Sequence, residues 1–265
     1  MNLLSLGGGV QSTTLLLMAL TGELPVLDGV IFADTGWEPT AVYRHIDTLE
    51  STCRDAGVAF HRVSRENIKA DVLDPNRRFA SMPLHILNPD GQPGMIRRQC
   101  TREYKIDPIN RKVRELLGGK TRGKKVQQWI GISLDEIWRM REARVRYIRL
   151  VYPLIDRRMR RYDCLRWLEA HHYPIPPKSA CVGCPFHSNE QWRHLKHNSP
   201  ADWADAVAFD EAIRNGNVRL GRAGLRGKAF LHRSLKPLSE VDVSNATDKG
   251  QLDLFNLECD GLCGV

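Results

Sequence analysis

Two cysteines, Cys181 and Cys184, stand three positions apart in the stretch KSACVGCPFHSNEQW, and Pro185 follows them directly. A C-x-x-C pair can bind one metal ion or one edge of an iron–sulfur cluster, and the proline favours an exposed turn over a continuing helix. Two thiolates do not hold a cluster, so other ligands are needed. Cys164, 17 residues before Cys181, is one candidate, although its apolar neighbours in a predicted helix also suit a buried thiol. A zinc knuckle and unligated thiols are the other interpretations.

A glycine turn in SLGGGVQSTTLL is the second feature whose residue types could do chemistry. Consecutive glycines let the backbone approach a phosphate closely, and the N-terminus of a following helix adds free amide donors. Ser12 and Thr13 offer hydroxyl groups at the same place. The spacing matches neither the Walker pattern nor G-x-G-x-x-G, so a tight turn without a ligand is the alternative.

The glycine turn needs a strand before it and a helix after it, and the sequence predicts both. An apolar run at 2–6 is followed by helical periodicity at 13–22, and a buried strand at 26–36 precedes a helical pattern at 38–57. With a third strand at 58–64, this β-α-β-α-β alternation predicts an α/β fold with a doubly wound parallel sheet. Further predicted elements are strands at 126–133 and 144–155, helices at 105–118, 160–172, 189–198 and 200–216, and an irregular excursion at 74–96.

Length and composition set the class of protein. A chain of 265 residues that is 42% hydrophobic can bury a large core, and we expect a nucleotide-binding domain at 1–160, a cluster-binding helical extension at 161–238 and a flexible polar tail at 239–265. The apolar runs near the N-terminus are too short to cross a bilayer, which predicts a cytoplasmic protein without a membrane partner. Seven cysteines, an odd number, argue against a disulfide framework and for ligands or nucleophiles.

The positive charge is concentrated in one third of the chain. Residues 97–161 contain 20 basic and 7 acidic side chains, a net charge of +13, whereas the whole chain carries +8. A phosphate-rich partner, either a nucleotide or a nucleic acid, would account for this concentration. A solvated, highly charged helix face is the alternative.

Five short stretches in a fixed order resemble one protein family. GGGVQST resembles the S-G-G-x-D-S loop of the adenine nucleotide alpha-hydrolase (PP-loop) superfamily, particularly its phosphoadenylyl-sulfate and adenylyl-sulfate (PAPS/APS) reductase branch. ADTGWEPTAVY is similar to that branch's D-T-G segment, QCTREYKIDP to its C-C-x-x-x-K-x-x-P segment and GISLDEIWRMR to its G-I-R-x-x-E-S segment, and CVGC follows. Gln11 stands where ATP-cleaving members carry Asp, and Thr101 replaces the second cysteine of the paired form.

The resemblance implies a Rossmann-like nucleotide domain that binds ATP or PAPS/APS, with Mg²⁺ as a candidate cofactor. Asp34, at the carboxyl end of a strand, also occupies a position where such sheets bind ligands, although it could instead cap the next helix. The nucleotide-binding residues are expected to be Ser5, Gly7, Gly8, Gly9, Gln11, Ser12, Thr13, Asp34, Thr35, Gly36, Arg98 and Gly131. The expected ligands of a 4Fe–4S cluster are Cys100, Cys164, Cys181 and Cys184. The basic residues around Cys100 add anion-binding charge: Arg97, Arg98, Arg102 and Lys105.

The C-terminal sequence NLECDGLCGV resembles the E-C-G-L ending with which sulfonucleotide reductases present a nucleophilic cysteine, with Asp260 inserted. The resemblance makes Cys259 the expected nucleophile, and Cys263 or a thioredoxin-like dithiol would resolve the covalent intermediate. A disordered end with two unremarkable cysteines is the alternative.

These observations lead to three functional hypotheses. The first is an iron–sulfur oxidoreductase that carries out thiol-dependent reduction of an adenylyl-sulfate substrate. The second is ATP-dependent transfer of sulfur from a donor to DNA or tRNA, with the basic segment holding the nucleic acid. The third is a regulatory or defence component that binds nucleotide and cluster without turnover. The sequence does not indicate an oligomeric state.

Overall fold

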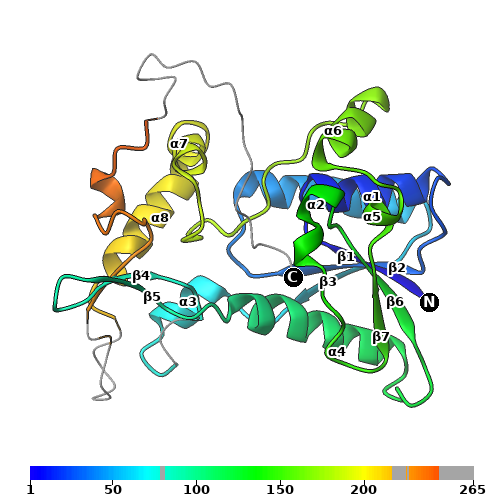
Figure 1. Ribbon diagram of the computed structural model, residues 1–265, viewed down its shortest axis with the longest axis horizontal. Helices are drawn as coiled ribbons and strands as arrows, with labels where there is room; N and C mark the ends of the chain where they lie inside the picture. The colour runs from blue at the N-terminus through cyan, green and yellow to red at the C-terminus, as the bar shows by residue number, and fades with distance from the viewer. Residues whose placement is uncertain (78–80, 217–224, 226, 245–265) are drawn as a thin grey trace.

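A five-stranded parallel sheet forms the centre of the protein, for which a computed structural model describes residues 1–77, 81–216, 225 and 227–244 (Figure 1). Every pair of neighbouring strands in this sheet is parallel, as the alternating pattern predicts. In spatial order the strands are β3 (Phe60–Ser64), β2 (Gly29–Asp34), β1 (Asn2–Leu6), β6 (Val126–Ile130) and β7 (Ile148–Val151).

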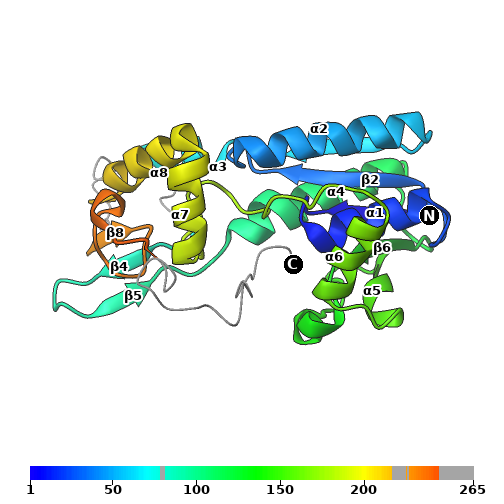
Figure 2. The ribbon, with the colours of Figure 1, turned by 90° about the horizontal axis from the view of Figure 1, so that it is seen from above.

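Helices cover both faces of the sheet (Figure 2). On one face lie α1 (Val10–Leu20), α2 (Thr40–Asp55), α5 (Pro153–Asp156) and α6 (Arg161–Ala170), whereas α4 (Asp107–Leu116) lies on the other. The strands alternate accordingly: Leu4 and Leu6 enter the core under α1, and Leu3 enters the core under α4. The coarse prediction of an α/β fold with a parallel sheet is therefore confirmed.

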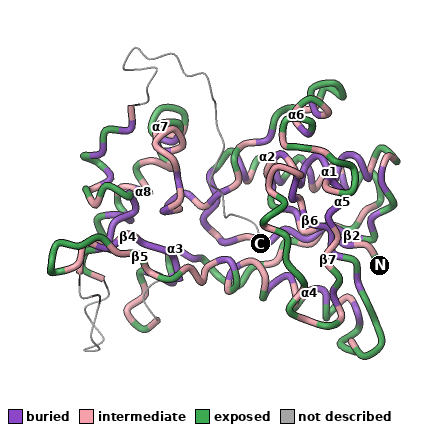
Figure 3. Tube along the Cα trace, viewed as in Figure 1, coloured by how far each residue is buried: buried purple, intermediate pink, exposed green. Residues whose placement is uncertain are grey.

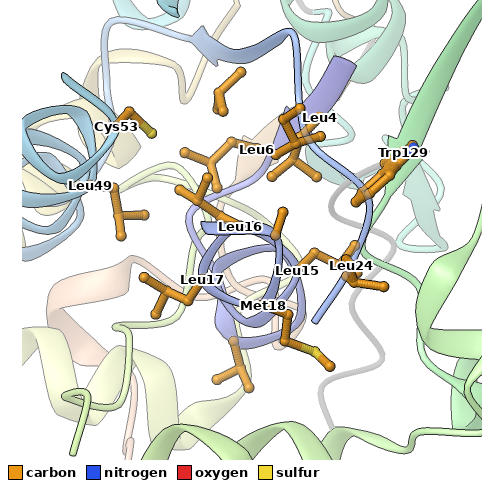
Figure 4. Packing of buried hydrophobic residues seen from close by; sticks show 14 of the residues in the cluster. Leu4, Leu6, Leu15, Leu16, Leu17, Met18, Leu24, Leu49, Cys53 and Trp129 are labelled. Atoms are coloured by element: carbon orange, nitrogen blue, oxygen red, sulfur yellow. The ribbon is translucent and has the colours of Figure 1, made fainter. Parts of the chain in front are cut away.

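Helix α1 is buried along almost its whole length (Figures 3 and 4). It lies between the sheet and α6, and residues on every side of the helix are inaccessible to solvent, including Leu15, Leu16 and Met18. A helix that is apolar all round is typical of a buried position. The turn that leads into α1 is consequently fixed by packing at its helical end.

The order of the strands creates a switch point beside β1. The chain proceeds from β1 to β2 and β3 on one side and returns at β6 on the other side of β1. In open parallel sheets, ligands bind outside the carboxyl ends of the strands at such a point, because the connections diverge there. The glycine turn follows β1, and Gly131 follows β6.

A second, smaller sheet lies beyond one edge of this core (Figure 1). Its antiparallel strands are β5 (Pro93–Met95), β4 (His85–Leu87) and β8 (Lys228–Phe230). The prediction of an irregular excursion at 74–96 is wrong for β4 and β5, because strands of three residues carry too little alternation to be recognised. Around this sheet pack α3 (Ile68–Leu73), α7 (Asn189–Asn198), α8 (Pro200–Ala212) and a short 3-10 helix, Leu238–Glu240.

The second hydrophobic core combines segments that are far apart in the sequence. Trp37, Ile86 and Trp192 all belong to it, whereas α6 packs on α1 in the first core. The two cores therefore do not divide the chain at residue 160. Val241 and Val243 are buried as well, so the first residues of the predicted tail are ordered by packing.

Two irregular helices connect the sheet to its surroundings. A π-helix, Thr101–Ile106, runs into α4, and a 3-10 segment, Leu134–Arg139, follows β6. Among the helices of the described ranges, none combines the length and the apolarity that a membrane crossing requires.

Candidate functional site

The glycine turn after β1 is built so that backbone amides face the switch point. Gly8 has φ +78°, which a residue with a side chain rarely adopts, and Gly9 caps α1 without a side-chain hydrogen bond to the first-turn amides. An anion placed there would meet these amides and the positive end of the helix dipole. The backbone of the predicted turn therefore suits a phosphate.

The hydroxyl groups expected to bind phosphate are engaged within the protein. Ser12 Oγ accepts a hydrogen bond from the amide of Gly7 at 3.2 Å and donates to the carbonyl of Gly9 at 3.3 Å. Thr13 Oγ1 lies 3.0 Å from Nε2 of His45, whose burial lowers the pKa of its imidazole. Both hydroxyls have partners within the protein, so backbone amides of the turn are the remaining candidates for donating hydrogen bonds to a phosphate.

Gly131 permits the close approach of β6 to this turn. A Cβ atom at this position would lie 2.8 Å from the amide nitrogen of Ser12, which is shorter than any ordinary contact. The expected nucleotide residue Gly131 thus has a clear steric role. Ser5, in contrast, sits inside β1, where the side-chain amide of Gln128 donates to its hydroxyl.

Gln11 joins the glycine turn to the segment after β6. Its Nε2 donates to Glu136 Oε2 at 3.2 Å, and its Oε1 accepts from Arg161 Nη1 at 3.0 Å. Glu136 in turn forms an ion pair with Arg139. The residues Glu136 and Arg161 were not among the predicted site residues, although Glu136 lies in the segment that resembles G-I-R-x-x-E-S.

The loop after β2 forms the second wall of the site. Asp34 Oδ1 accepts hydrogen bonds from the amide of Gly36 at 2.7 Å and from Tyr43 OH at 2.9 Å, so this carboxylate holds its own loop. Gly36 has φ +73°, and a Cβ atom there would lie 2.8 Å from Cα of Asn67. Thr35 is buried and donates to Glu38 Oε1 at 3.0 Å.

The C-x-x-C turn packs directly on this loop. Cys181 Sγ lies 3.2 Å from Thr35 Oγ1, and the amide of Val182 donates to the carbonyl of Trp37 at 2.9 Å. Gly183 lies against the Trp37 ring so closely that a Cβ atom would overlap it. Burial, followed by the charge of Glu38, raises the pKa of the Cys181 thiol.

The same turn also reaches the glycine turn. Ser179, two residues before Cys181, donates its hydroxyl hydrogen to the carbonyl oxygen of Gly7. Cys100, at the start of the π-helix, is close enough for its charge to raise the pKa of Cys181 further. The structure therefore brings Cys100, Cys181 and the glycine turn to one side of the sheet.

Cys164 lies elsewhere. It is completely buried in the first core, where α6 packs on α1, and burial raises the pKa of its thiol to about 12. Cys100, in contrast, packs against the second core. The interpretation of Cys164 as a small buried residue fits this position better than its role as a ligand.

A cluster held by four thiolates does not fit this arrangement. The thiol of Cys164 is enclosed by the apolar side chains of another core, and within the described part of the chain no three His, Cys, Asp or Glu side chains are grouped as ligands of a metal ion. Cys184 shares a turn with Cys181, its amide donating to the Cys181 carbonyl at 3.0 Å. The expected ligand set is thus reduced to Cys100, Cys181 and Cys184.

The remaining predicted residues are distributed as follows. The guanidinium of Arg98 lies over the ring of Phe186 at 5.6 Å from its centre, so it flanks the C-x-x-C turn. Lys105 Nζ lies 3.9 Å from Glu38 Oε1, inside the site. Cys259 and Cys263 lie outside the described residues. Sequence reasoning did not single out Glu38, although it lies within the stretch ADTGWEPTAVY.

Neither a scan against protein-family models nor a search of curated proteins returns a match for this chain.

Proposed function

We propose that this protein is an enzyme that binds an adenine nucleotide on the glycine turn and carries out sulfur chemistry beside it. The observation that carries the proposal is the convergence of three segments at the switch point. Ser179 bonds to Gly7, and Cys181 contacts Thr35, so a thiol turn, the loop after β2 and a phosphate-binding turn adjoin one another. Each of these three segments contains one of the five motifs that resemble the PAPS/APS reductase family.

The reaction that we favour is thiol-dependent reduction of an adenylyl sulfate. The Cys259 thiolate attacks the sulfonate sulfur, the bond from sulfur to the phosphate oxygen breaks, and the nucleotide leaves with that electron pair. A dithiol, either a thioredoxin-like protein or one that includes Cys263, then attacks the Cys259 sulfur and releases sulfite. The dithiol ends as a disulfide, so it supplies both electrons. No step in this sequence is assigned to a metal cluster.

Gln11 supports reduction over cleavage of ATP. ATP-cleaving members of the superfamily carry Asp at this position, and a carboxylate oxygen is the ligand that Mg²⁺ prefers. Gln11 offers a neutral amide, and that amide already bonds to Glu136 and Arg161. An enzyme that displaces a nucleotide from sulfur has no need of a magnesium ion at this point.

The test uses anaerobically purified protein, adenylyl sulfate and phosphoadenylyl sulfate as substrates, and thioredoxin with its reductase as electron source. We expect sulfite to form with the wild-type protein and Cys259→Ser to abolish its formation while leaving nucleotide affinity, measured by calorimetry, unchanged. Asn256→Ala, in the same C-terminal stretch but with both thiols intact, is the control. Undiminished sulfite formation by Cys259→Ser would contradict the mechanism.

A second candidate function, transfer of sulfur to a nucleic acid, is favoured by one specific surface. We call it the Trp138 surface. Trp138 and Tyr162 are 67% and 66% exposed. The segments that carry them adjoin, because the amide of Arg161 donates to Asp135 at 3.0 Å. Exposed arginines occur in the same two segments of the chain, 134–146 and 157–162: Arg141, Arg144, Arg146, Arg157, Arg158 and Arg160. Aromatic faces among arginines suit stacked bases and phosphates.

A further inference from the structure

The C-x-x-C turn holds its two cysteines at the spacing that a disulfide requires. The amide of Cys184 donates to the carbonyl oxygen of Cys181 at 3.0 Å, which closes a turn over these four residues. In a β-turn the first and fourth Cα atoms lie less than about 7 Å apart. Disulfides form between Cα atoms that are about 4.4–6.8 Å apart. Both cysteines are reduced and partly exposed, so rotation of their side chains can bring the two sulfur atoms together without a large movement of the backbone.

Contacts on two sides fix this turn. The amide of Val182 donates to the carbonyl oxygen of Trp37 at 2.9 Å, and Nε2 of His187 donates to the carbonyl oxygen of Cys181 at 3.0 Å. Gly183 packs on the Trp37 ring so closely that no side chain fits between them. Because closing a short loop costs little conformational entropy, each cysteine meets the other more readily than it meets a thiol on another segment.

The same turn lacks the further ligands that a metal centre would need. In the part of the chain that the structure covers, no three His, Cys, Asp or Glu side chains are grouped as metal ligands. Cys53 and Cys164 are completely buried in the first hydrophobic core, whereas the C-x-x-C turn packs on Trp37 in the second. A C-x-x-C pair that no metal holds is typical of thiol–disulfide exchange.

Glu38 places a proton acceptor beside one of these thiols. Cys181 Sγ donates to Glu38 Oε1 at 3.8 Å, and the hydroxyl of Thr35 donates to the same oxygen at 3.0 Å. The second carboxylate oxygen, Oε2, is buried and has no hydrogen-bond partner among the described residues. Glu38 is thus positioned to take the proton that Cys181 releases when its sulfur reacts.

We propose that Cys181 and Cys184 are a redox-active dithiol whose substrate is a small-molecule disulfide, a role that goes beyond the proposed function. One cysteine attacks a sulfur of that disulfide, so its S–S bond breaks, a mixed disulfide forms and one thiol leaves. The other cysteine attacks the protein sulfur of the mixed disulfide, which forms the Cys181–Cys184 bond and releases the second thiol. The protein thereby loses two electrons and two protons, the proton of Cys181 by way of Glu38, and the two released thiols carry them away.

The test uses the full-length protein, purified anaerobically, reduced, and then equilibrated in buffers that differ in the ratio of glutathione to glutathione disulfide. After alkylation of the remaining thiols, trypsin releases residues 179–193 as one peptide that contains both cysteines. As glutathione disulfide increases, we expect this peptide to lose both alkylation sites together and to become lighter by two hydrogen atoms. Dithiothreitol should restore both sites. Cys164→Ala, the matched control, should follow the wild-type curve.

Single substitutions identify the attacking thiol. Cys181→Ser and Cys184→Ser each leave one thiol in the turn, so at least one of them should stop at the mixed disulfide and gain one glutathione on this peptide. The proposal fails if neither variant forms that adduct, or if the wild-type peptide stays reduced at every ratio. A bond that joins it to Cys100 or to the peptide of residues 250–265 would also overturn it. No nucleotide is present, so the result is independent of the proposed function.

Discussion

Gly131, which directly follows β6, lies against the start of α1 beside the glycine turn. Hydrogen is the only substituent that fits between β6 and the amide of Ser12, because a Cβ atom would lie 2.8 Å from that nitrogen. The amides of the turn have to be aimed at one point to bind a phosphate, and a shift of the α1 terminus would spread them. The position of this glycine thus links the packing of the sheet to ligand binding.

At this scale we predict that Gly131→Ala abolishes nucleotide binding. The methyl group displaces Ser12 and the start of α1, and overpacking of this kind costs about 1–3 kcal/mol of stability. Calorimetric titration with an adenine nucleotide measures the first effect and urea unfolding the second. Ile132→Val, which removes one buried methyl group at a cost of about 1 kcal/mol, is the matched control and should retain nucleotide affinity. Wild-type affinity in Gly131→Ala would contradict this view of the turn.

Individual site residues were predictable where the chemistry was local. The glycine turn follows a strand and precedes a helix, and both signals lie within a dozen residues. Glu38 was not predictable, because its importance arises from Cys181, which is distant in sequence and reaches it only through tertiary packing. Cys164 was proposed as a ligand because it lies near Cys181 in the sequence. Nearness in sequence does not show on which side of α6 the thiol lies.

At the scale of elements, α8 organises the second core through one carboxylate. Asp210 is completely buried, and it accepts hydrogen bonds from the amides of Leu231 and Leu238 and from Arg214. These bonds attach β8 and the segment after it to the helix. His232 lies in this attached segment, where the amide of Ser234 donates to Nδ1 at 3.1 Å.

His232 makes the attached segment sensitive to acid. Because Nδ1 accepts from Ser234, Nε2 carries the proton and faces Asn189 Oδ1 at 3.1 Å. A second proton on the imidazole would make Nδ1 a donor as well, and it would then face the Ser234 amide, which is also a donor. The pKa of His232 is lowered from 6.5 to about 4, mainly by burial and then by the charges of Arg233 and His85, against the opposing charge of Asp210.

We therefore expect the free energy of unfolding to fall as pH decreases from about 6.5 to about 4. In this window the unfolded chain binds a proton at His232 and the folded chain does not, which costs on the order of 3 kcal/mol by pH 4. His232→Gln should reduce the slope of this part of the profile, measured by urea unfolding at a series of pH values. The remaining slope is due to other buried groups such as His187, whose pKa burial also lowers to about 4. His197→Gln, at an exposed position on α7, should keep the wild-type slope. Parallel profiles for His232→Gln and the wild-type protein would exclude His232 as the cause.

The elements themselves were predicted unevenly. The parallel sheet and the helices at 189–198 and 200–212 follow from periodicity over many residues. The small antiparallel sheet was missed, since its three strands have three residues each and its third strand comes from 228–230, more than a hundred residues after the first two. Local patterns cannot report pairing at that distance.

At the scale of the whole molecule, exposed arginines and two exposed aromatic rings occur in the same segments of the chain, 134–146 and 157–162. The Trp138 surface is connected to the glycine turn, because the Gln11 side chain forms hydrogen bonds with both Glu136 and Arg161. A nucleic acid held there would lie beside the proposed reaction centre. Arg111 and Arg114 are also exposed, but they belong to α4 on the opposite face of the sheet (Figure 1).

If the Trp138 surface binds single-stranded nucleic acid, affinity for a fluorescent oligonucleotide should decrease steeply with salt. Trp138→Ala should weaken binding by about 1–3 kcal/mol, roughly five- to 150-fold, through the loss of one stacked base. The pair Arg141→Gln and Arg144→Gln should reduce the salt dependence, whereas Arg111→Gln on α4 should not. Binding that is weak, nonspecific and equal in all these variants would leave reduction as the better hypothesis, and nucleotide binding without turnover on either substrate would indicate a regulatory component.

The contact between Gly183 and Trp37 affects the order in which the parts of the protein lose their structure. Trp37 belongs to the second hydrophobic core, although it lies on the loop that follows β2. The C-x-x-C turn packs on its ring. If heat, oxidation or proteolytic cleavage disrupts the packing of the second hydrophobic core, Trp37 moves, and the C-x-x-C turn loses the surface on which it packs. If the proposed function is right, loss of the C-x-x-C turn should precede unfolding of the central sheet, so that damaged molecules would still bind nucleotide after the proposed sulfur chemistry has ceased.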